Sequence, residues 1–265
     1  MKQFLILCLC FIPVAAMSQT ELIILGTVHF PTQNVNADSI FEILEQVKPD
    51  VILLESDHSN FNEDYTFKRT YKENEWMAAV KYRKRYPSTL FRPMELEGRN
   101  RIRKALGING NNPVFNHIYY QRKRLSKEMR RDFRYSERLS KELQGFGEAN
   151  LRTINSVSTD NLVEERQFYV YKKTLEIVNS YPLFEDILLE DNKVPMSAKE
   201  YHNKYCTFEE RRNHAMSKNI LKYVEAFKGK RILVMTGFYH RAELINYLRF
   251  EEELYDFRLK EFYDI

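Results

Sequence analysis

Residues 21–29 read ELIILGTVH, an apolar run that reaches a glycine and then, three residues later, His29. Residues 231–240 read RILVMTGFYH, so the same pattern returns near the other end of the chain and ends in His240. Unalternated apolar runs are typical of parallel strands covered on both faces, and glycine permits a tight turn and a close backbone approach. Each histidine is therefore expected just beyond the carboxyl end of a strand, where open α/β sheets bind ligands.

The segment after the first run predicts a β-α-β unit. Residues 39–47 place their apolar side chains on one helical face, and Asp38 is a suitable N-cap. A second apolar run, residues 51–54, then ends at Glu55. A right-handed crossover places both runs in one sheet, and the run at 231–236 is expected to join them.

Two further segments are candidate edge strands, and they complete the predicted fold. One is 89–95, which Pro93 confines to an edge or shortens. The other is 254–259, which alternates in polarity. We therefore predict an α/β fold with a central, mostly parallel sheet flanked by helices. A large helical insertion is expected between the N-terminal and C-terminal sheet segments.

The insertion is expected at residues 60–207, where the chain becomes highly charged. Long helices are predicted at 116–143 and 162–180, and a third at 208–227 with Thr207 as its cap. Between residues 68 and 141 there are 21 Lys and Arg against 7 Asp and Glu, whereas the whole chain carries a net charge of only +4. This basic stretch could face an anionic ligand or a membrane surface, or could form solvated helices. It contains no recognisable nucleic-acid-binding module.

The first 18 residues have the pattern of a secretory signal peptide. Lys2 precedes an apolar run at 4–16 that is too short to span a bilayer comfortably, and Ala16 and Ser18 suit a cleavage site before Gln19. We therefore expect a secreted, periplasmic protein with one domain at 19–265 and no stable membrane span. Cys206 is then the sole cysteine, so no intramolecular disulfide is expected.

Four polar residues are predicted to share one site: His29, Glu55, Arg212 and His240. Glu55 ends an apolar strand, so its carboxylate should emerge at the same sheet edge as the histidines. Two histidines and a carboxylate form a suitable ligand set for a divalent metal with positions open to water. Such a metal lowers the pKa of bound water and polarises a carbonyl. Glu95, at the end of the candidate strand at 89–95, is a weaker candidate.

A second mechanism needs no metal, and the sequence leaves both open. One histidine, oriented by Glu55, could act as a general base on water. Arg212 could then stabilise the developing oxyanion. The other histidines have no comparable context and are expected to be structural or at the surface: His58, His117, His202 and His214.

Four motifs together resemble the TraB/TIKI/GumN superfamily, which is related to erythromycin-esterase-like and ChaN-like haem-uptake proteins. The first is ILGTVH at 24–29, and the second is DVILLE at 50–55. The third is ERRNHAM at 210–216, similar to the family's Arg-Asn-x-x-Met helix. The fourth is VMTGFYH at 234–240, similar to its closing Gly-x-x-His. The order and spacing of all four agree, which is more specific than any one alone.

This resemblance implies an α/β fold with a helical insertion and a hydrolase-type site. TIKI members are metal-dependent proteases, erythromycin-esterase-like members hydrolyse esters without an obligatory metal, and ChaN-like members bind haem. The expectation is a secreted metal-dependent, peptidase-like hydrolase acting on a peptide or small molecule. His29, Glu55 and His240 would hold Mn, Co or Zn, and Glu55 and Arg212 would take part in catalysis. The alternatives are a metal-independent His/Glu esterase and a non-catalytic haem- or ligand-binding protein that uses Tyr239.

Overall fold

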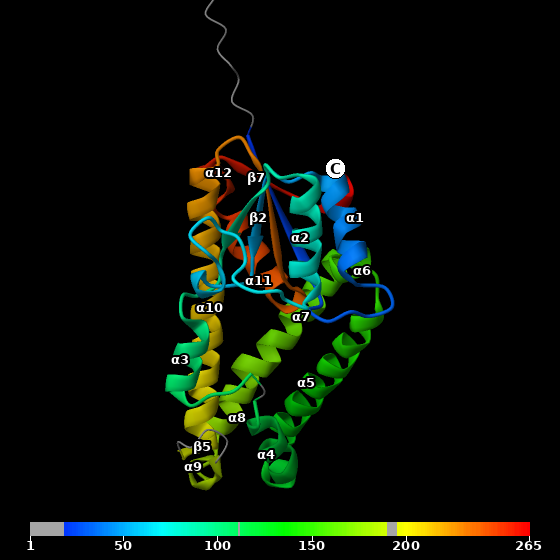
Figure 1. Cartoon of the computed structure of the whole chain (residues 1–265). Coiled ribbons are helices and arrows are strands. Elements are labelled where there is room, and N and C mark those ends of the chain that lie inside the picture. The colour runs from blue at the N-terminus through cyan, green and yellow to red at the C-terminus, as the bar shows by residue number, and fades with distance from the viewer. Residues whose placement is uncertain (1–18, 111, 190–194) are drawn as a thin grey trace, which may run out of the picture.

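The computed structural model describes residues 19–110, 112–189 and 195–265. Within these residues the chain has the predicted mixed α/β fold, with a parallel sheet, flanking helices and a long helical segment between strands (Figure 1). The expected signal segment, residues 1–18, lies outside the described residues. None of the helices in the described part of the chain has both the length and the apolar character needed to cross a bilayer.

The sheet has the strand order β3-β2-β6-β1-β7, and every neighbouring pair is parallel. The two Gly-x-x-His segments follow β1 and β6, which are direct neighbours and pair from Glu21↔Arg231 to Thr27↔Gly237. Both candidate edge strands are present, one at each side of the sheet. The five strands are β1 (Thr20–Thr27), β2 (Val51–Leu54), β3 (Leu90–Pro93), β6 (Arg231–Gly237) and β7 (Phe257–Lys260).

Helices cover both faces of the sheet because alternate strand residues point to opposite sides. On one face, residues such as Ile23 and Leu25 pack with α1 (Ala37–Val47) and α2 (Asn74–Arg85). On the other face, Leu22 and its alternates pack with the C-terminal half of the long helix α10 and with α11. These two helices are α10 (Ala198–Ala226) and α11 (Phe238–Arg249).

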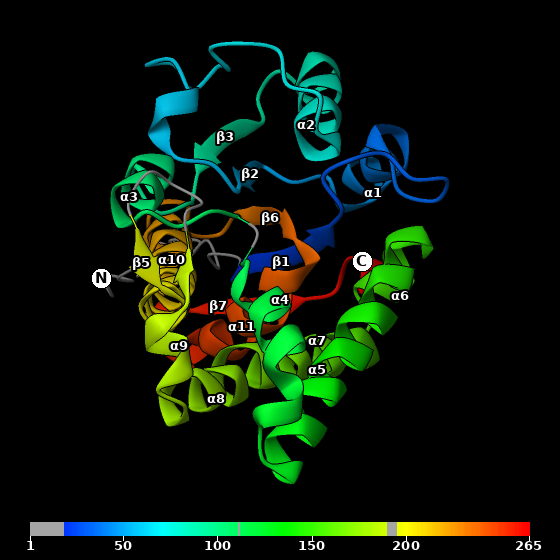
Figure 2. The same cartoon turned by 90° about the horizontal axis from the view of Figure 1, so that it is seen from below.

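The insertion lies beneath the carboxyl edge of the sheet, so the carboxyl ends of β1, β2 and β6 point toward it (Figures 1 and 2). It has a core of its own, in which Ile118, Phe133 and Phe184 are buried. The 60–207 range also contributes β3 and a short antiparallel ribbon. The helices and short strands are α3 (Arg99–Leu106), α4 (Val114–Gln121), α5 (Lys127–Gly145), α6 (Leu151–Ile154), α7 (Val157–Gln167), a π-helical segment (Phe168–Lys173), α8 (Thr174–Ser180), α9 (Leu183–Asp186), β4 (Leu188–Leu189) and β5 (Met196–Ser197); α12 (Glu252–Tyr255) follows later.

The helix predicted at 208–227 begins ten residues earlier, and Thr207 is not its cap. The Ser197 hydroxyl accepts a hydrogen bond from the Glu200 N–H at 3.1 Å, so α10 begins at Ala198 and runs through Thr207. This extension joins the insertion to the sheet by one continuous helix. It also places Arg212 in the middle of α10 rather than in its first turns.

Two other predicted helix boundaries were wrong for similar reasons. Asn36, not Asp38, caps α1, because its side chain accepts hydrogen bonds from the backbone N–H groups of Asp38 and Ser39. The predicted helix at 116–143 is divided by a 3₁₀ turn at Arg122–Arg124, after which Ser126 caps α5. Local side-chain caps therefore decide where these helices begin.

Candidate functional site

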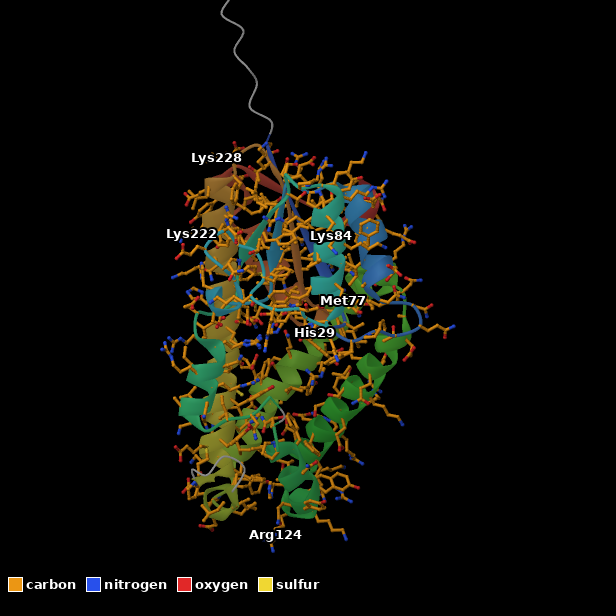
Figure 3. The ribbon with its side chains drawn as sticks, in the orientation of Figure 1. His29, Met77, Lys84, Arg124, Lys222 and Lys228 are labelled. Atoms are coloured by element: carbon orange, nitrogen blue, oxygen red, sulfur yellow. The ribbon has the colours of Figure 1, made fainter. Side chains whose placement is uncertain are left out.

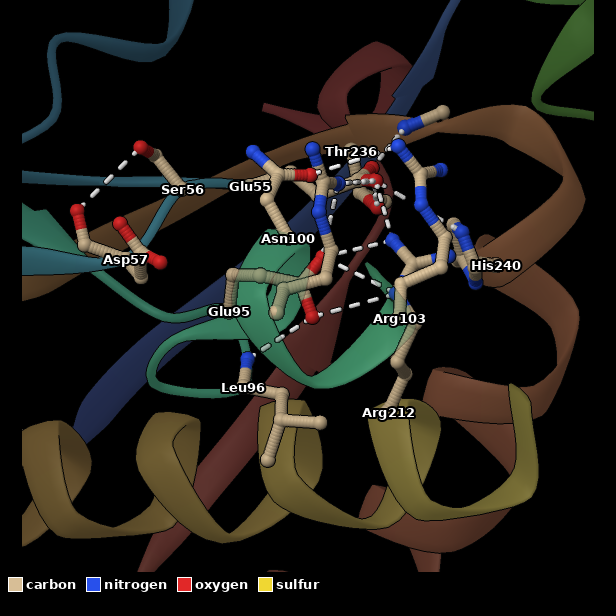
Figure 4. A network of polar contacts seen from close by, with 12 residues as sticks. Glu55, Ser56, Asp57, Glu95, Leu96, Asn100, Arg103, Arg212, Thr236 and His240 are labelled. Carbon is tan, nitrogen blue, oxygen red and sulfur yellow. Dashed lines mark hydrogen bonds and ion pairs between the residues drawn. The ribbon is translucent and has the colours of Figure 1, made fainter. Parts of the chain in front are cut away.

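The four predicted site residues come from four different elements and converge at the carboxyl edge of the sheet. His29 lies in the loop after β1, and Glu55 follows β2 directly. His240 lies in the first turn of α11, which follows β6, and Arg212 comes from α10. Figure 4 shows the Glu55, Arg212 and His240 side chains pointing toward one another.

The Glu55 carboxylate is held by donors on both of its oxygens. Its Oε2 atom accepts hydrogen bonds from the Thr236 hydroxyl and the Gly237 N–H, each at 2.8 Å. Its Oε1 atom accepts from Arg212 Nη2 at 3.0 Å and lies 3.6 Å from His240 Nε2. Burial opposes ionisation of Glu55, but its electrostatic interactions with the neighbouring His240 and Arg212 outweigh this effect and hold the pKa of Glu55 well below the usual range. Glu55 is therefore a fixed anion at the centre of the site.

Arg212 is the cation of a buried carboxylate cluster, which we define as Glu55, Glu95 and Glu209. Its guanidinium lies 2.6 Å from Glu95, 2.8 Å from Glu209 and 3.0 Å from Glu55. Burial disfavours the charged arginine, but the carboxylates, Glu95 foremost, raise its pKa above the ordinary value. Glu95, the weaker candidate of the sequence analysis, thus lies in the site. Every guanidinium nitrogen of Arg212 already has a carboxylate partner, so this arginine organises the site rather than facing a substrate.

His29 is oriented by Glu75 rather than by Glu55. Its Nδ1 atom lies 2.8 Å from a Glu75 carboxylate oxygen, which also accepts a hydrogen bond from the Thr27 hydroxyl. The hydrogen bond to Glu75 raises the pKa of His29 to about 9. The other Glu75 oxygen is buried and has no hydrogen-bond partner among the described residues. His29 and Glu75 therefore form a histidine–carboxylate pair at the first turn of α2.

The glycines of the two Gly-x-x-His segments are required by close approaches. A Cβ atom at Gly237 would lie 3.2 Å from His29 Nε2 and 3.6 Å from Glu55 Oε2. A Cβ atom at Gly26 would lie 3.0 Å from the Arg241 side chain and 3.1 Å from the Phe238 backbone. Without side chains at these positions, His29 can approach the end of β6, and α11 can pack against β1.

His240 is held by the amide of Asn213. Its Nδ1 atom lies 2.7 Å from Asn213 Oδ1, and its Nε2 atom faces Glu55. Burial lowers the pKa of His240 below its usual range. The Arg-Asn-x-x-Met segment therefore has three separate tasks, because Arg212 holds the carboxylates, Asn213 orients His240, and Met216 is buried in the core against the sheet.

The donor chemistry of His29, Glu55 and His240 suits a divalent metal, but their arrangement does not form a ligand set. In favour of a metal, each histidine has a polar partner on Nδ1, as is usual for metal-bound histidines, and the Nε2 atom of His240 faces Glu55. Against it, both Glu55 oxygens already accept hydrogen bonds from the protein. Within the described residues, no group of three or more His, Cys, Asp or Glu side chains is placed to hold a metal ion. The metal stays a prediction.

A polar cavity of about 400 Å³ opens over part of this site. Its lining includes His29, Glu55 and Glu75, together with Arg99 from the first turn of α3. The Arg99 guanidinium lies 3.1 Å from Glu95 and 3.8 Å from Glu55, and its side chain is 29% exposed. We call this the polar cavity. A bound molecule would thus meet His29 and Arg99, and it would also meet Glu55 and Glu95 of the carboxylate cluster, which line the same cavity.

Sequence reasoning missed Glu75, Arg99 and Asn213 as site residues. Nothing in the sequence around Glu75 or Arg99 distinguishes them from other charged residues of the insertion. Asn213 had a signal, because it stands inside the Arg-Asn-x-x-Met segment. Tyr239 is the residue named for the haem-binding alternative. It packs under the Arg166 guanidinium at 4.8 Å and against Phe238, and it does not line the polar cavity.

Comparisons of the chain with protein-family models, curated protein sequences and solved structures found no match. The resemblance to the TraB/TIKI/GumN superfamily therefore rests on the four quoted motifs alone.

Proposed function

We propose that the chain is a hydrolase of ester or amide bonds in which His29 activates water. The observation that carries the proposal is the His29–Glu75 pair, because a carboxylate on Nδ1 fixes the ring and leaves Nε2 available in the polar cavity. This is the metal-independent mechanism of the two that the sequence leaves open, with Glu75 in the orienting role that the sequence gave to Glu55.

In the proposed reaction, His29 Nε2 takes a proton from water as the water oxygen attacks the carbonyl carbon. The Arg99 guanidinium lies on the cavity wall and would stabilise the oxyanion that forms. The imidazolium of His29 then returns the proton to the leaving oxygen or nitrogen as the bond to the carbonyl carbon breaks. Glu75 and the Glu55 charge both stabilise this imidazolium, as the raised pKa of His29 indicates.

The carboxylate cluster supplies a fixed electrostatic environment. Glu55 remains an anion, and Arg212 neutralises part of the cluster charge without leaving its partners. The Nε2 atom of His240 faces Glu55, and His240 does not line the polar cavity, so in this proposal it supports the carboxylate and is not the base. A preorganised set of charges of this kind needs little rearrangement during reaction.

The test is turnover of short-chain aryl esters and of a fluorogenic peptide mixture by wild type, His29→Gln and His214→Gln. His214 is an exposed histidine on α10 and serves as the matched control. Loss of a general base typically costs about a hundredfold or more in rate, so we expect that loss in His29→Gln and none in the control. Turnover that survives in His29→Gln would refute the proposal. Turnover that a chelator abolishes and a divalent metal restores would favour the metal-dependent mechanism instead.

A further inference from the structure

A second cavity, of about 750 Å³, lies beside α2 and adjoins the polar cavity. Two of its apolar side chains are notably exposed for their type, Met77 at 49% and Val80 at 37%. Apolar side chains open to solvent inside a cavity indicate a binding surface rather than part of the core. We call this the α2 cleft, and its apolar and aromatic lining consists of Phe67, Tyr71, Trp76, Met77, Val80 and Phe91.

The aromatic wall of the α2 cleft is held rigidly. The Tyr71 and Trp76 rings stack with centroids 4.0 Å apart, and Phe67 packs against Trp76 at 4.5 Å and against Phe91 at 5.1 Å. A preformed apolar wall binds an apolar ligand without the entropic cost of ordering its own side chains. Phe91 belongs to β3, so the wall is anchored to the sheet.

The rim of the α2 cleft is cationic. Its charged lining residues are Arg69, Lys81, Arg83 and Lys84, and no Asp or Glu belongs to the lining. Lys81 is paired with Asp38 at 2.8 Å, whereas Arg69 and Lys84 form no ion pair with any described residue. The polar cavity differs, because its arginines lie among several carboxylates. The cleft is therefore complementary to a ligand that is both apolar and negatively charged.

The α2 cleft is continuous with the polar cavity. Arg69, Tyr71 and Trp76 line both. Along α2, Glu75 turns to His29 while the next residue, Trp76, lines the cleft. Figure 3 shows His29, Met77 and Lys84 in succession along this side of the molecule. A molecule lying along α2 would therefore reach His29 with one end.

We propose that the α2 cleft binds the apolar segment of an anionic amphiphilic substrate, an acyl or aryl compound that carries a carboxylate or similar anion. The anion lies at the rim near Lys84, the apolar segment lies against the aromatic wall, and the scissile carbonyl reaches His29. The position of the carbonyl rests on the proposed function, whereas the binding of an apolar anion does not.

The binding test uses the fluorescence of Trp76, the only tryptophan in the chain, which lines the cleft. The full chain is titrated with decanoate, with decyltrimethylammonium as the cation of equal chain length, and with acetate as the short anion. We expect saturable quenching by decanoate and at least about tenfold weaker binding of the other two. Equal binding of the cationic amphiphile would overturn the proposal.

Three variants locate the binding. Met77→Asp and Lys84→Glu should each weaken decanoate binding by about fivefold or more, because they remove apolar contact and reverse a rim charge. Lys222→Glu is the matched control, since Lys222 is an exposed lysine on α10 and lies away from Lys84 (Figure 3). The two cleft side chains are exposed, so neither change should affect folding. If Lys84→Glu behaves as Lys222→Glu does, the cleft is not the binding site.

One further variant separates this inference from the proposed function. His29→Gln should bind decanoate as wild type does while losing ester hydrolysis. Hydrolysis of short esters without decanoate binding would refute the cleft and leave the function intact. Decanoate binding sensitive to Lys84→Glu, without hydrolysis of any ester, would support the cleft as a ligand site and refute the function.

Discussion

Replacing Arg212 with methionine should destabilise the fold more than any other single charge removal in the site. The Arg212 side chain is 10% exposed, and its guanidinium contacts three carboxylates whose side chains are 9%, 1% and 12% exposed. Removing one partner of a buried ion pair typically costs about 3–5 kcal/mol, because the remaining charge stays desolvated and unpaired. Methionine has a similar apolar stem, so the charge and its hydrogen bonds are the main loss.

We expect the loss of unfolding free energy in Arg212→Met to stay within about 3–5 kcal/mol, although three carboxylates lose their cation. The reason is that two of these carboxylates keep other donors. Glu55 retains Thr236 and the Gly237 N–H, and Glu95 retains Arg99. Glu209 has no other hydrogen-bond partner among the described residues. We therefore expect a loss of about 4 kcal/mol, which in a chain of this size lowers Tm by about 10 °C.

The assay is urea denaturation followed by circular dichroism near neutral pH, with Arg124→Met as the control. Arg124 is exposed at the tip of the insertion (Figure 3), and such a change should stay within about 0.5 kcal/mol. The loss in Arg212→Met should shrink at about pH 5, because buried carboxylates without a cation take up protons as the pH falls. A loss below about 1 kcal/mol, or an equal loss at both pH values, would refute the assignment of Arg212 as the cluster cation.

Four further results are expected. First, if His29 is the base, kcat/KM should rise about tenfold per pH unit from neutral pH and level off above about 9, since only neutral imidazole accepts a proton; a plateau already at pH 7 would contradict this role. Second, Glu75→Gln should shift the pH at which kcat/KM levels off from about 9 toward 6.5. The His29–Glu75 pair raises the pKa of His29 in the folded state. The stabilisation of the fold by this pair is therefore full below pH 6.5 and is lost as the pH rises through about 9. Because the His29 side chain is 48% exposed, we expect about 1 kcal/mol at low pH, measured by urea denaturation across pH. Third, Gly237→Ala places a Cβ 3.2 Å from His29 Nε2 and should cost about tenfold in rate with little change in Tm; full activity would show that this approach is not needed. Fourth, metal content by mass spectrometry after equilibration with Mn, Co and Zn should be negligible in wild type and in His29→Ala/His240→Ala; stoichiometric metal lost in the double variant would establish the metal-dependent mechanism.

The sequence predicted the sheet well because its strands carry a strong local signal. Residues 51–54 form a strand with the predicted bounds, and the runs at 21–25 and 231–236 became β1 and β6 with small extensions. The expectation that the two ends of the chain meet is confirmed by the pairing of β1 with β6. Helix starts were less predictable, because several capping side chains compete within a few residues, as Asn36 and Asp38 do before α1.

The site was predictable only where a residue directly follows a strand. Glu55 and His240 are fixed by β2 and β6, so the sheet topology brings them together. Glu75 and Arg99 stand at the starts of α2 and α3, and their positions depend on how those helices pack against the rest of the chain. Contacts of that kind are set by tertiary structure and leave no periodic trace in the sequence.

The first turn of α2 connects the polar cavity with the α2 cleft. Successive helical residues point in directions about 100° apart, so Glu75 and Trp76 face different surroundings although they are adjacent. Glu75 contacts His29, and Trp76 forms part of the aromatic wall of the α2 cleft. One rigid turn therefore fixes the distance between the group proposed to activate water and the surface proposed to hold the substrate. Glu55, the glutamate at the end of β2, already accepts hydrogen bonds from three protein donors. We therefore expect the rate of the proposed reaction to depend more on the His29–Glu75 pair at α2 than on Glu55.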